Sequence, residues 1–229
     1  MSEIDSRTKL VLGDAAIEKL KASHVALFGL GGVGGYCLEA LVRAGVGELD
    51  LYDGDVFDSS NLNRQLLSTT NVLGMEKTEV AKERALSIRP NLKISTHQMF
   101  YLPEKADEID FTIYDYVIDA IDTVTAKLSL IEQAKKANVP VISCMGAGNK
   151  KDPTAFHVSD IAQTSVCPLA KVMRKELKVR GIENVKVVFS TEPVSRPEGQ
   201  SEKIGSLVTT VAAAGILLAN EVIMDLIRG

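Results

Sequence analysis

The sequence predicts an α/β protein with a Rossmann-like, doubly wound, mostly parallel sheet that carries helices on both faces. Short apolar runs alternate with helical patterns along residues 24–144, which indicates successive right-handed βαβ units. A glycine-rich turn joins the first apolar run to the first helical pattern. No repeat or low-complexity tract interrupts the 229 residues, so we expect a single domain over residues 1–229.

The individual elements follow in chain order. A lead-in helix is expected over residues 10–22. Strands are expected at residues 24–28, 48–52, 93–97, 116–119 and 139–144, with helices between them at residues 34–44, 77–88 and 125–137. Ligands of such sheets bind at the carboxyl ends of the strands, near the point where the strand order reverses. This rule places residues 29–34, Asp53 and residues 119–123 around one crevice.

The pattern changes after Gly148. Residues 154–160 and 185–192 have the pattern of strands and flank a basic helix expected at residues 169–179. We expect these strands to extend the sheet with antiparallel pairing. The polar Pro/Gly segment of residues 191–203 is expected to form a mobile crossover or lid.

The C-terminal run of residues 204–220 carries no charge and reaches the lower length limit of a membrane span. Polar residues interrupt it, so a buried interface helix is favoured and no stable membrane insertion is expected. The N-terminal segment MSEIDSRTKL lacks the apolar core of a signal peptide, and the three cysteines form no CxxC pair. These features predict a cytoplasmic protein.

The charge of the chain is unevenly distributed. The net charge of −4 argues against general affinity for nucleic acids. Residues 150–186 nevertheless carry eight basic and four acidic side chains, so this segment has a charge of +4 and the remainder −8. Lys171, Arg174 and Lys178 lie on the expected basic helix. This asymmetry hints at an anionic partner, with an ordinary solvated helix face as the alternative.

The turn GLGGVG contains Gly29, Gly31, Gly32 and Gly34 in the spacing of a dinucleotide fingerprint. Glycines there permit a tight turn and a close approach of the ligand, and the N–H groups at the helix start stabilise phosphate oxygens. Asp53 ends the second strand, where a carboxylate can hold ribose hydroxyls. Taken alone, these features favour an NAD-dependent dehydrogenase.

The residues that follow Asp53 favour ATP instead. Arg64 and Lys77 are suited to neutralise phosphate oxygens and a departing pyrophosphate, with solvated surface charges as the alternative. Asp119 and Asp122 follow the fourth strand, and one of them can face the crevice as a ligand of Mg²⁺ bound to substrate phosphates. A helix N-cap is the alternative role for Asp122.

These motifs resemble those of the adenylating family that includes the molybdopterin-synthase and thiamine-pathway adenylyltransferases and the ubiquitin-activating enzymes. The matching residues are Gly29, Gly31, Gly34, Asp53, Asp55, Asn61, Asn63, Arg64, Gln65, Lys77 and Asp122, with Thr123 at the position of a family Asn. The resemblance implies that residues 1–150 bind ATP and magnesium, with Asp122 as the metal ligand. It also implies transfer of AMP to a carboxylate.

The resemblance extends to the quaternary structure. The family uses an N-terminal arginine that reaches across a dimer interface to the phosphates, and Arg7 stands at that position. The resemblance therefore implies a homodimer with Arg7 acting in the partner's site. A surface arginine without a role in the site is the alternative.

The second half of the chain resembles one branch, the tRNA threonylcarbamoyladenosine dehydratases. Pro168-Leu169-Ala170 precedes the basic helix, and Phe189-Ser190-Thr191-Glu192 ends a strand. This branch uses ATP to close the threonylcarbamoyl group on adenosine 37 of tRNA into a ring. The resemblance implies that residues 151–229 serve the substrate and the dimer, and that the basic helix contacts the tRNA backbone.

Two further expectations concern alternatives to this reaction. Cys167 has no evident base in the sequence and is expected to be a bystander, because an intramolecular attack needs no enzyme thiol. The alternative function is adenylation of the C-terminal carboxylate of a ubiquitin-like sulfur carrier, against which the absence of paired CxxC zinc ligands weighs. A sulfur-relay protein remains a further partner that the resemblance allows.

Overall fold

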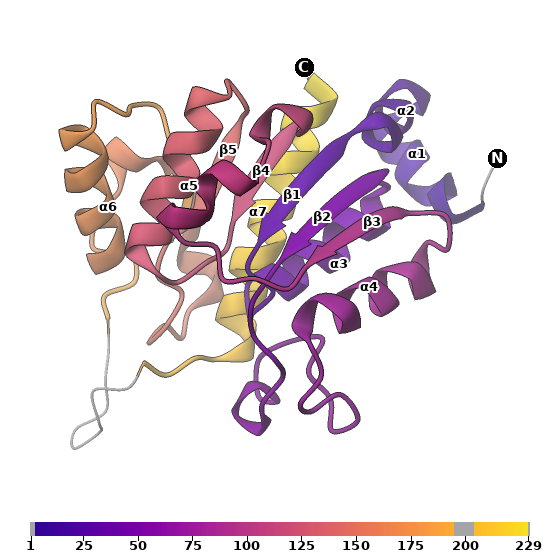
Figure 1. The fold of residues 1–229 in the computed structure, drawn as a ribbon, viewed down its shortest axis with the longest axis horizontal. Helices are drawn as coiled ribbons and strands as arrows, with labels where there is room; N and C mark the ends of the chain where they lie inside the picture. The colour runs from indigo at the N-terminus through magenta and orange to yellow at the C-terminus, as the bar shows by residue number, and fades with distance from the viewer. Residues whose placement is uncertain (1–2, 195–203, 229) are drawn as a thin grey trace.

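The computed structural model describes residues 3–194 and 204–228 (Figure 1). Its strands are β1 (His24–Phe28), β2 (Glu48–Tyr52), β3 (Lys93–His97), β4 (Tyr116–Asp119), β5 (Val141–Cys144), β6 (Phe156–Asp160) and β7 (Lys186–Ser190). They form one sheet in the order β3-β2-β1-β4-β5-β7-β6. All neighbours are parallel except β6 and β7, so antiparallel pairing is confined to the edge strand β6. The predicted doubly wound fold is confirmed.

The helices agree with the predicted pattern except at the N-terminus. They are α1 (Ser6–Leu12), α2 (Asp14–Ala22), α3 (Gly34–Ala44), α4 (Lys77–Ile88), α5 (Val124–Lys136), α6 (Pro168–Val179) and α7 (Val208–Arg228). The single lead-in helix expected over residues 10–22 is wrong, because Gly13 with φ +84° ends α1 and starts α2. A positive φ of this kind interrupts a right-handed helix and is accessible to glycine.

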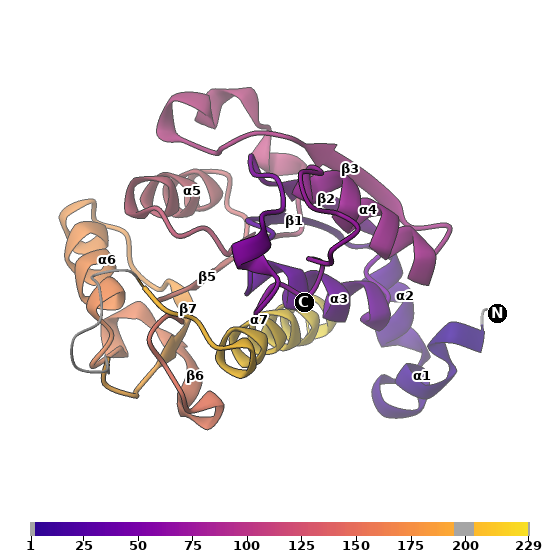
Figure 2. The same ribbon diagram turned by 90° about the horizontal axis from the view of Figure 1, so that it is seen from below.

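Two apolar layers cover the sheet. One layer joins α3, α4 and α7 to the sheet through side chains such as Leu38, Ala81 and Leu218. The other layer joins α5 and α6 through Leu130 and Met173. Figure 2 shows α5 and α6 on one side of the sheet and α3 and α7 on the other. Because both faces are covered, the central strands β1, β4 and β5 are buried on both sides and are mostly apolar.

The C-terminal helix α7 is long and apolar enough to cross a membrane by length and composition. In this fold it packs against α3, where a Cβ on Gly215 would overlap the carbonyl oxygen of Val33. Val211, Leu218 and Val222 are buried in the same apolar layer. The apolar composition of α7 therefore has a packing explanation within the fold, as expected for a buried helix.

The strand order places the functional edge of the sheet. The chain runs from β1 to β2 on one side and returns to β4 on the other side, so the order reverses at β1. The carboxyl ends of these parallel strands open onto one edge, where ligands of doubly wound sheets bind. The loops after β1, β2, β4 and β5 meet there.

Candidate functional site

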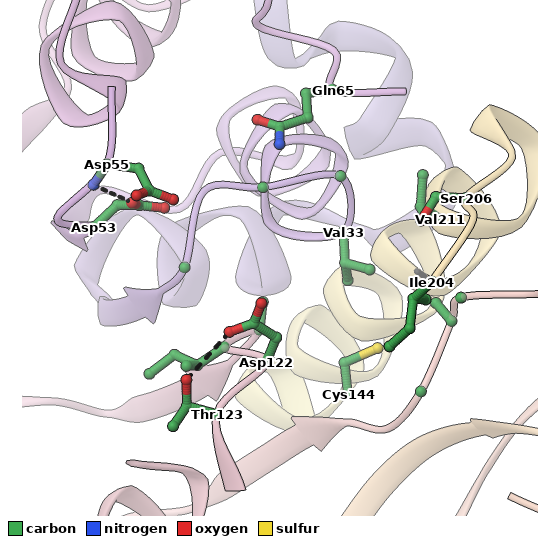
Figure 3. A pocket seen from close by; sticks show the side chains of 18 of the residues that line it. Val33, Asp53, Asp55, Gln65, Asp122, Thr123, Cys144, Ile204, Ser206 and Val211 are labelled. Carbon is green, nitrogen blue, oxygen red and sulfur yellow. Dashed lines mark hydrogen bonds between the residues drawn. The ribbon is translucent and has the colours of Figure 1, made fainter. Parts of the chain in front are cut away.

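A cavity of about 970 Å³ opens at the carboxyl edge of the sheet (Figure 3). The predicted nucleotide-site residues that line it are Gly29, Gly31, Gly32, Asp53, Asp55, Asn61, Arg64, Gln65, Lys77, Asp122 and Thr123. They come from separate loops that converge because their strands are neighbours in the sheet. The topology therefore assembles one concave, charged site from residues that span almost 100 positions of the chain.

The glycines of the turn have different roles. A Cβ at Gly29, which has φ +91°, would lie 2.7 Å from the carbonyl oxygen of Ala120, and one at Gly34 would overlap the Gly29 carbonyl oxygen. Gly29 thus permits close packing of the turn against the loop after β4, and Gly34 permits close packing of the start of α3 against the end of β1. A Cβ at Gly31 would meet no heavy atom nearer than Nε2 of Gln65 at 3.9 Å. Gly31 is therefore the position where a ligand can approach the backbone closely.

Asp53 connects the end of β2 to the glycine turn. One carboxylate oxygen accepts a hydrogen bond from the backbone N–H of Leu30 at 2.6 Å, and the other accepts from the N–H of Asp55 at 2.9 Å. The first bond orients the turn after β1. Carboxylate oxygens each accept more than one hydrogen bond, so Asp53 can still receive ribose hydroxyls.

The segment that carries Arg64 is shaped by a capping box. Asp58 accepts a hydrogen bond from the N–H of Ser60, and the side-chain oxygen of Asn61 accepts from the N–H of Asp58 at 3.1 Å. The hydrogen bonds from Ser60 hold the pKa of Asp58 below its usual value. Two successive backbone turns then place Arg64 and Gln65 at the cavity, since both of their N–H groups donate to the Asn61 carbonyl oxygen.

Two cations line the phosphate side of the cavity. Arg64 uses Nη1 to donate to the Ser60 carbonyl oxygen at 2.7 Å and to Oδ1 of Asn63 at 3.0 Å, which leaves its other nitrogens for a ligand. Nζ of the buried Lys77 lies 2.9 Å from Oδ2 of the largely exposed Asp55. A phosphate that enters the cavity can therefore compete with Asp55 for Lys77.

Asp119, one of the two predicted metal ligands, belongs to the protein interior. It is fully buried, and its carboxylate lies 2.9 Å from Nζ of the equally buried Lys127. It also accepts a hydrogen bond from the hydroxyl of Ser143 on β5. Its charge is thus neutralised within the sheet, and Asp119 is not part of the cavity lining.

Asp122 has the opposite environment, because it is exposed and lines the cavity. Thr123 precedes α5 as its N-cap residue, and no side chain caps this helix, so the capping role considered for Asp122 is wrong. The hydrogen bond found at its carboxylate comes from the Thr123 hydroxyl at 3.3 Å (Figure 3). The carboxylate oxygens of Asp122 are therefore available to a ligand.

The donor set fits a magnesium ion held mainly by its substrate. In the described ranges 3–194 and 204–228, no three His, Cys, Asp or Glu residues are grouped to hold a metal. Mg²⁺ is usually bound through one or two carboxylates together with substrate phosphates and water. A single accessible carboxylate such as Asp122 beside a triphosphate site matches that preference.

Gln65 lines the cavity and carries a buried acceptor with no partner in the described part of the chain. The residue is buried, and its Nε2 would lie 3.9 Å from a Cβ on Gly31. Its Oε1 has no hydrogen-bond partner among the described residues. A buried acceptor without a partner costs about 1–3 kcal/mol.

Several predicted residues lie outside the cavity lining. Gly34 packs against the turn as described above, and Asn63 donates to the carbonyl oxygen of Ser206 at 3.2 Å, which ties the segment before α7 to the Arg64 segment. Arg7 is exposed on α1 and does not line the cavity of its own chain. Most of the expected crossover loop, residues 195–203, lies outside the described residues.

The basic segment is only partly a surface. Lys171 and Lys178 are exposed on α6, whereas Nη1 of Arg174 donates to the carbonyl and the hydroxyl of Thr164, each at 2.6 Å. Lys186 is paired with two acidic residues of α7 at 2.7 Å. The basic face therefore consists of fewer residues than the charge count of the segment indicates.

Sequence reasoning missed lining residues that follow β3 and β5. They include Phe100, Met145, Asn149 and Lys150. The strand-end rule that selected Asp53 would have found them, because these residues also follow carboxyl ends of parallel strands.

Two cysteines also line the cavity. Burial raises the pKa of the Cys144 thiol to about 12. Cys167 is buried at the start of α6, and no described group forms a hydrogen bond with its Sγ. The raised pKa of Cys144 disfavours the thiolate, which is the reactive form of cysteine.

Comparisons with known proteins agree with this geometry. The model of the ThiF family matches residues 6–228. The tRNA threonylcarbamoyladenosine dehydratase of Bacillus subtilis is 37% identical over 97% of this chain and 94% of its own length. Two solved structures of the Escherichia coli tRNA N6-threonylcarbamoyladenosine dehydratase, in complex with AMP and with ATP, superpose with TM-scores of 0.91 and 0.90. They are 32% and 31% identical to this chain and cover 97% of it and 93% of their own chains.

Proposed function

The chain belongs to the ThiF family, and on this premise we propose that it is an ATP-dependent adenylating enzyme that dehydrates N6-threonylcarbamoyladenosine at position 37 of tRNA. The observation that carries the proposal is one cavity that combines an open glycine turn at Gly31 with Arg64, Lys77 and Asp122. The similarity to dehydratases along nearly the whole chain supports this substrate over a sulfur carrier.

The reaction needs an activated carboxylate. A carboxylate oxygen of the threonylcarbamoyl group attacks the α-phosphorus of ATP, and the bond to pyrophosphate breaks as the new P–O bond forms. A nitrogen or oxygen of the same group then attacks the activated carbonyl carbon, and AMP departs with the former carboxylate oxygen. The oxygen that the modified adenosine loses leaves in AMP, and the hydrogen of the attacking N–H or O–H group leaves as a proton. Relative to its carboxylic acid form, the adenosine has then lost one water.

The residues of the cavity have distinct proposed roles. Asp53 holds the ribose, and the backbone at Gly31 approaches the phosphates. Arg64 and Lys77 stabilise the negative charge that moves onto the departing pyrophosphate, as fixed cations in a water-poor site do. Magnesium, which Asp122 would hold together with the phosphates, neutralises further phosphate charge when bound.

The nucleotide site also includes residues with supporting roles. Gly29, Gly32 and Gly34 shape the turn, while Asp55, Asn61, Asn63, Gln65 and Thr123 position its neighbours or the nucleotide. No thiol is required, because ring closure is intramolecular and the reacting groups are already close together. This agrees with a bystander role for Cys167.

The proposed assembly has further components. Lys171, Arg174 and Lys178 contact the phosphate backbone of the tRNA. The enzyme is a homodimer in which Arg7 reaches the partner's phosphates, and a sulfur-relay protein is an additional proposed partner. A tRNA substrate places the enzyme in the cytoplasm.

The test is nucleoside analysis of tRNA after incubation with the protein, ATP and Mg²⁺. We expect the modified adenosine to lose one water in a reaction that requires ATP and releases AMP. The tRNA without the threonylcarbamoyl group serves as the control and should not change. Unchanged modified tRNA together with adenylation of a sulfur-carrier C-terminus would favour the alternative function.

A further inference from the structure

Lys150 is a buried amine at the cavity to which the mechanism above assigns no role. The residue is 3% exposed and lines the cavity in the loop after β5. Its Nζ donates to the backbone carbonyl oxygen of Glu192. The two other buried lysines of the described chain, Lys77 and Lys127, each lie 2.9 Å from an aspartate. Lys150 thus differs from them, since no ion pair to a described carboxylate accompanies its burial.

The carboxylate of Glu192 is engaged elsewhere. It accepts hydrogen bonds from the backbone N–H groups of Asp152 at 3.0 Å and Lys151 at 2.9 Å. These bonds, together with the positive charge of Lys150, hold the pKa of Glu192 below its usual value. The Glu192 charge acts on Lys150 only from beyond ion-pair distance. The buried ammonium group of Lys150 has three N–H donors, and a single carbonyl oxygen accepts from it. Such a group still favours an anionic partner.

The loop that carries Lys150 is held in place from two sides. Glu192 binds its backbone at residues 151 and 152, as described above. Asn149 donates its N–H to the carbonyl oxygen of Gly205 at 2.8 Å, and its side-chain oxygen accepts from the Gly205 N–H at 2.8 Å. Hydrogen bonds with Glu192 and Gly205 therefore hold the loop that carries Lys150 in place.

Lys150 lies on the side of the cavity opposite the proposed ribose site. Asp53 follows β2, and the order β2-β1-β4-β5 places the end of β5 three strands away, about 14 Å across the sheet. Figure 3 shows Asp53 on one side of the cavity and Ile204 on the other. A Cβ on Gly148 would overlap the Ile204 side chain, so the loop after β5 borders that second side. On the proposed function the nucleotide would occupy the first side, which would leave this one to the second substrate.

We propose that Lys150 binds the carboxylate of the threonylcarbamoyl group and holds it for attack on ATP, an inference that rests on the proposed function. The attacking carboxylate is negatively charged and must approach a triphosphate that is also negatively charged. A cation on the acceptor side of the cavity offsets this repulsion and orients the carboxylate. Arg64 and Lys77 do not serve this purpose, because they are assigned to the phosphates.

The decisive experiment compares binding of threonylcarbamoylated tRNA with binding of the same tRNA without the modification, in the presence of a non-hydrolysable ATP analogue. We expect the wild-type protein to prefer the carboxylate-bearing tRNA. Lys150→Gln should reduce this preference by about 10-fold to 100-fold, as loss of a hydrogen bond to a charged group does. Lys150→Arg should retain most of it, and the affinity for the ATP analogue should stay unchanged in both variants.

Lys151→Gln is the matched control. Lys151 is exposed on the same loop, and its contact with Glu192 uses the backbone, so this variant removes one charge without altering the brace. It should behave as the wild type. Lys150→Met, which keeps the buried aliphatic stem, is a second neutral variant if Lys150→Gln does not fold.

The outcomes are distinguishable. An unchanged preference for modified tRNA in Lys150→Gln would overturn the inference. The inference would also be overturned if this variant kept the preference but had a lower melting temperature and bound the ATP analogue more weakly. That result would indicate a structural role for Lys150. A wild-type protein that shows neither preference nor turnover would contradict the proposed function and this inference with it. A selective rise in KM for modified tRNA in both neutral variants would support it.

Discussion

At the scale of single residues, Asp119 and Asp122 are only three positions apart, yet their carboxylates have opposite environments. Asp119 ends the buried strand β4, where Lys127 and Ser143 neutralise and bind it. Asp122 lies beyond the end of the sheet, where its carboxylate is exposed to the cavity. The same substitution is therefore expected to affect stability at one position and catalysis at the other.

Asp122→Asn and Arg64→Ala should each lower the rate of tRNA dehydration about 10²-fold to 10³-fold without unfolding the protein. The reason is that each removes a fixed charge contact to the nucleotide or its metal, which contributes about 2–4 kcal/mol to lowering the barrier. The measurement is kcat/KM by nucleoside analysis, with the melting temperature as the check of folding. Near-normal turnover in either variant would reject its assignment to the site.

Asp119→Asn provides the contrast. It leaves Lys127 buried without a counter-ion, so the free energy of unfolding should fall by about 3–5 kcal/mol.

Asp50 on β2 is the centre of a second buried polar group, remote from the reaction. Its carboxylate lies 3.0 Å from Nε2 of His24, accepts from the hydroxyl of Tyr114 at 2.9 Å, and lies 3.3 Å from Nε2 of His97. Burial alone would raise the pKa of Asp50. The hydrogen bonds from His24 and Tyr114, the charge of His24 and the hydrogen bond from His97 outweigh burial, so the pKa is lowered.

This lowered pKa predicts a stability contribution that depends on pH. The contribution is fully present above the unfolded-state pKa of about 3.9 and is lost as the pH falls through the lower folded-state pKa. Asp50→Asn should therefore be less stable than the wild type near pH 6, with a difference that shrinks below about pH 4. Urea unfolding at pH 6, 4 and 3 measures it. The exposed Asp107→Asn should show no such trend, and a constant deficit in Asp50→Asn would contradict the assignment.

At the scale of elements, α6 combines packing with a proposed tRNA contact. Met173 and Leu177 bury one side of the helix in the apolar layer under the sheet. Lys171 and Lys178 are exposed, and Arg174 is partly committed to Thr164. The helix is amphipathic for a structural reason, so its basic residues are the part that requires a functional test.

Replacement of Lys171, Arg174 and Lys178 together by alanine should weaken tRNA binding and leave ATP affinity intact. Each lost phosphate contact lowers the slope of log affinity against log salt by about 0.9 or less. The measurement is tRNA affinity at several salt concentrations. Lys93→Ala, an exposed lysine of the opposite edge strand β3, is the control and should bind as the wild type. Unchanged tRNA affinity in the triple variant would reject the basic face.

At the scale of the whole molecule, the proposed homodimer would complete each site with Arg7 of a second chain. Arg7 is exposed on α1 and does not line the cavity of its own chain. Leu10 and Val11 on the same helix are 78% and 82% exposed. Adjacent exposed apolar residues of this size are typical of an interaction surface. Contact with a second copy would cover them and bring Arg7 toward a partner's phosphates.

Mixing Arg7→Ala chains with Arg64→Ala chains tests this arrangement. If subunits exchange freely, about half of the dimers are mixed. In each mixed dimer one of the two sites would contain both arginines. Activity should therefore return toward one quarter of the wild-type value. The measurement is tRNA dehydration after co-refolding or co-expression. Each variant alone should remain inactive, and complete absence of rescue would count against action in trans.

The fold, and many of the residues that line the cavity, could be predicted from the sequence. The spacing of Gly29, Gly31 and Gly34 is a local pattern, and the strand-end rule then added Asp53 and Asp122. The prediction failed at Gly13, where one glycine with a positive φ divides a helical pattern. It also counted Lys150 only as part of the basic segment and did not place it at the cavity, because the strand-end rule had not been applied to the loop after β5.

The sequence by itself determined the order of strands and helices, the glycine-rich turn and the family. It could do so because periodicity, turns and motif spacing depend on residues close together in the chain. Only the tertiary structure decided which charged groups are neutralised and which face the cavity. Lys186 meets Glu221 35 positions away, and Lys150 meets a carbonyl 42 positions away. Burial and pairing depend on which distant segments the sheet makes neighbours, and that information is not contained in local pattern.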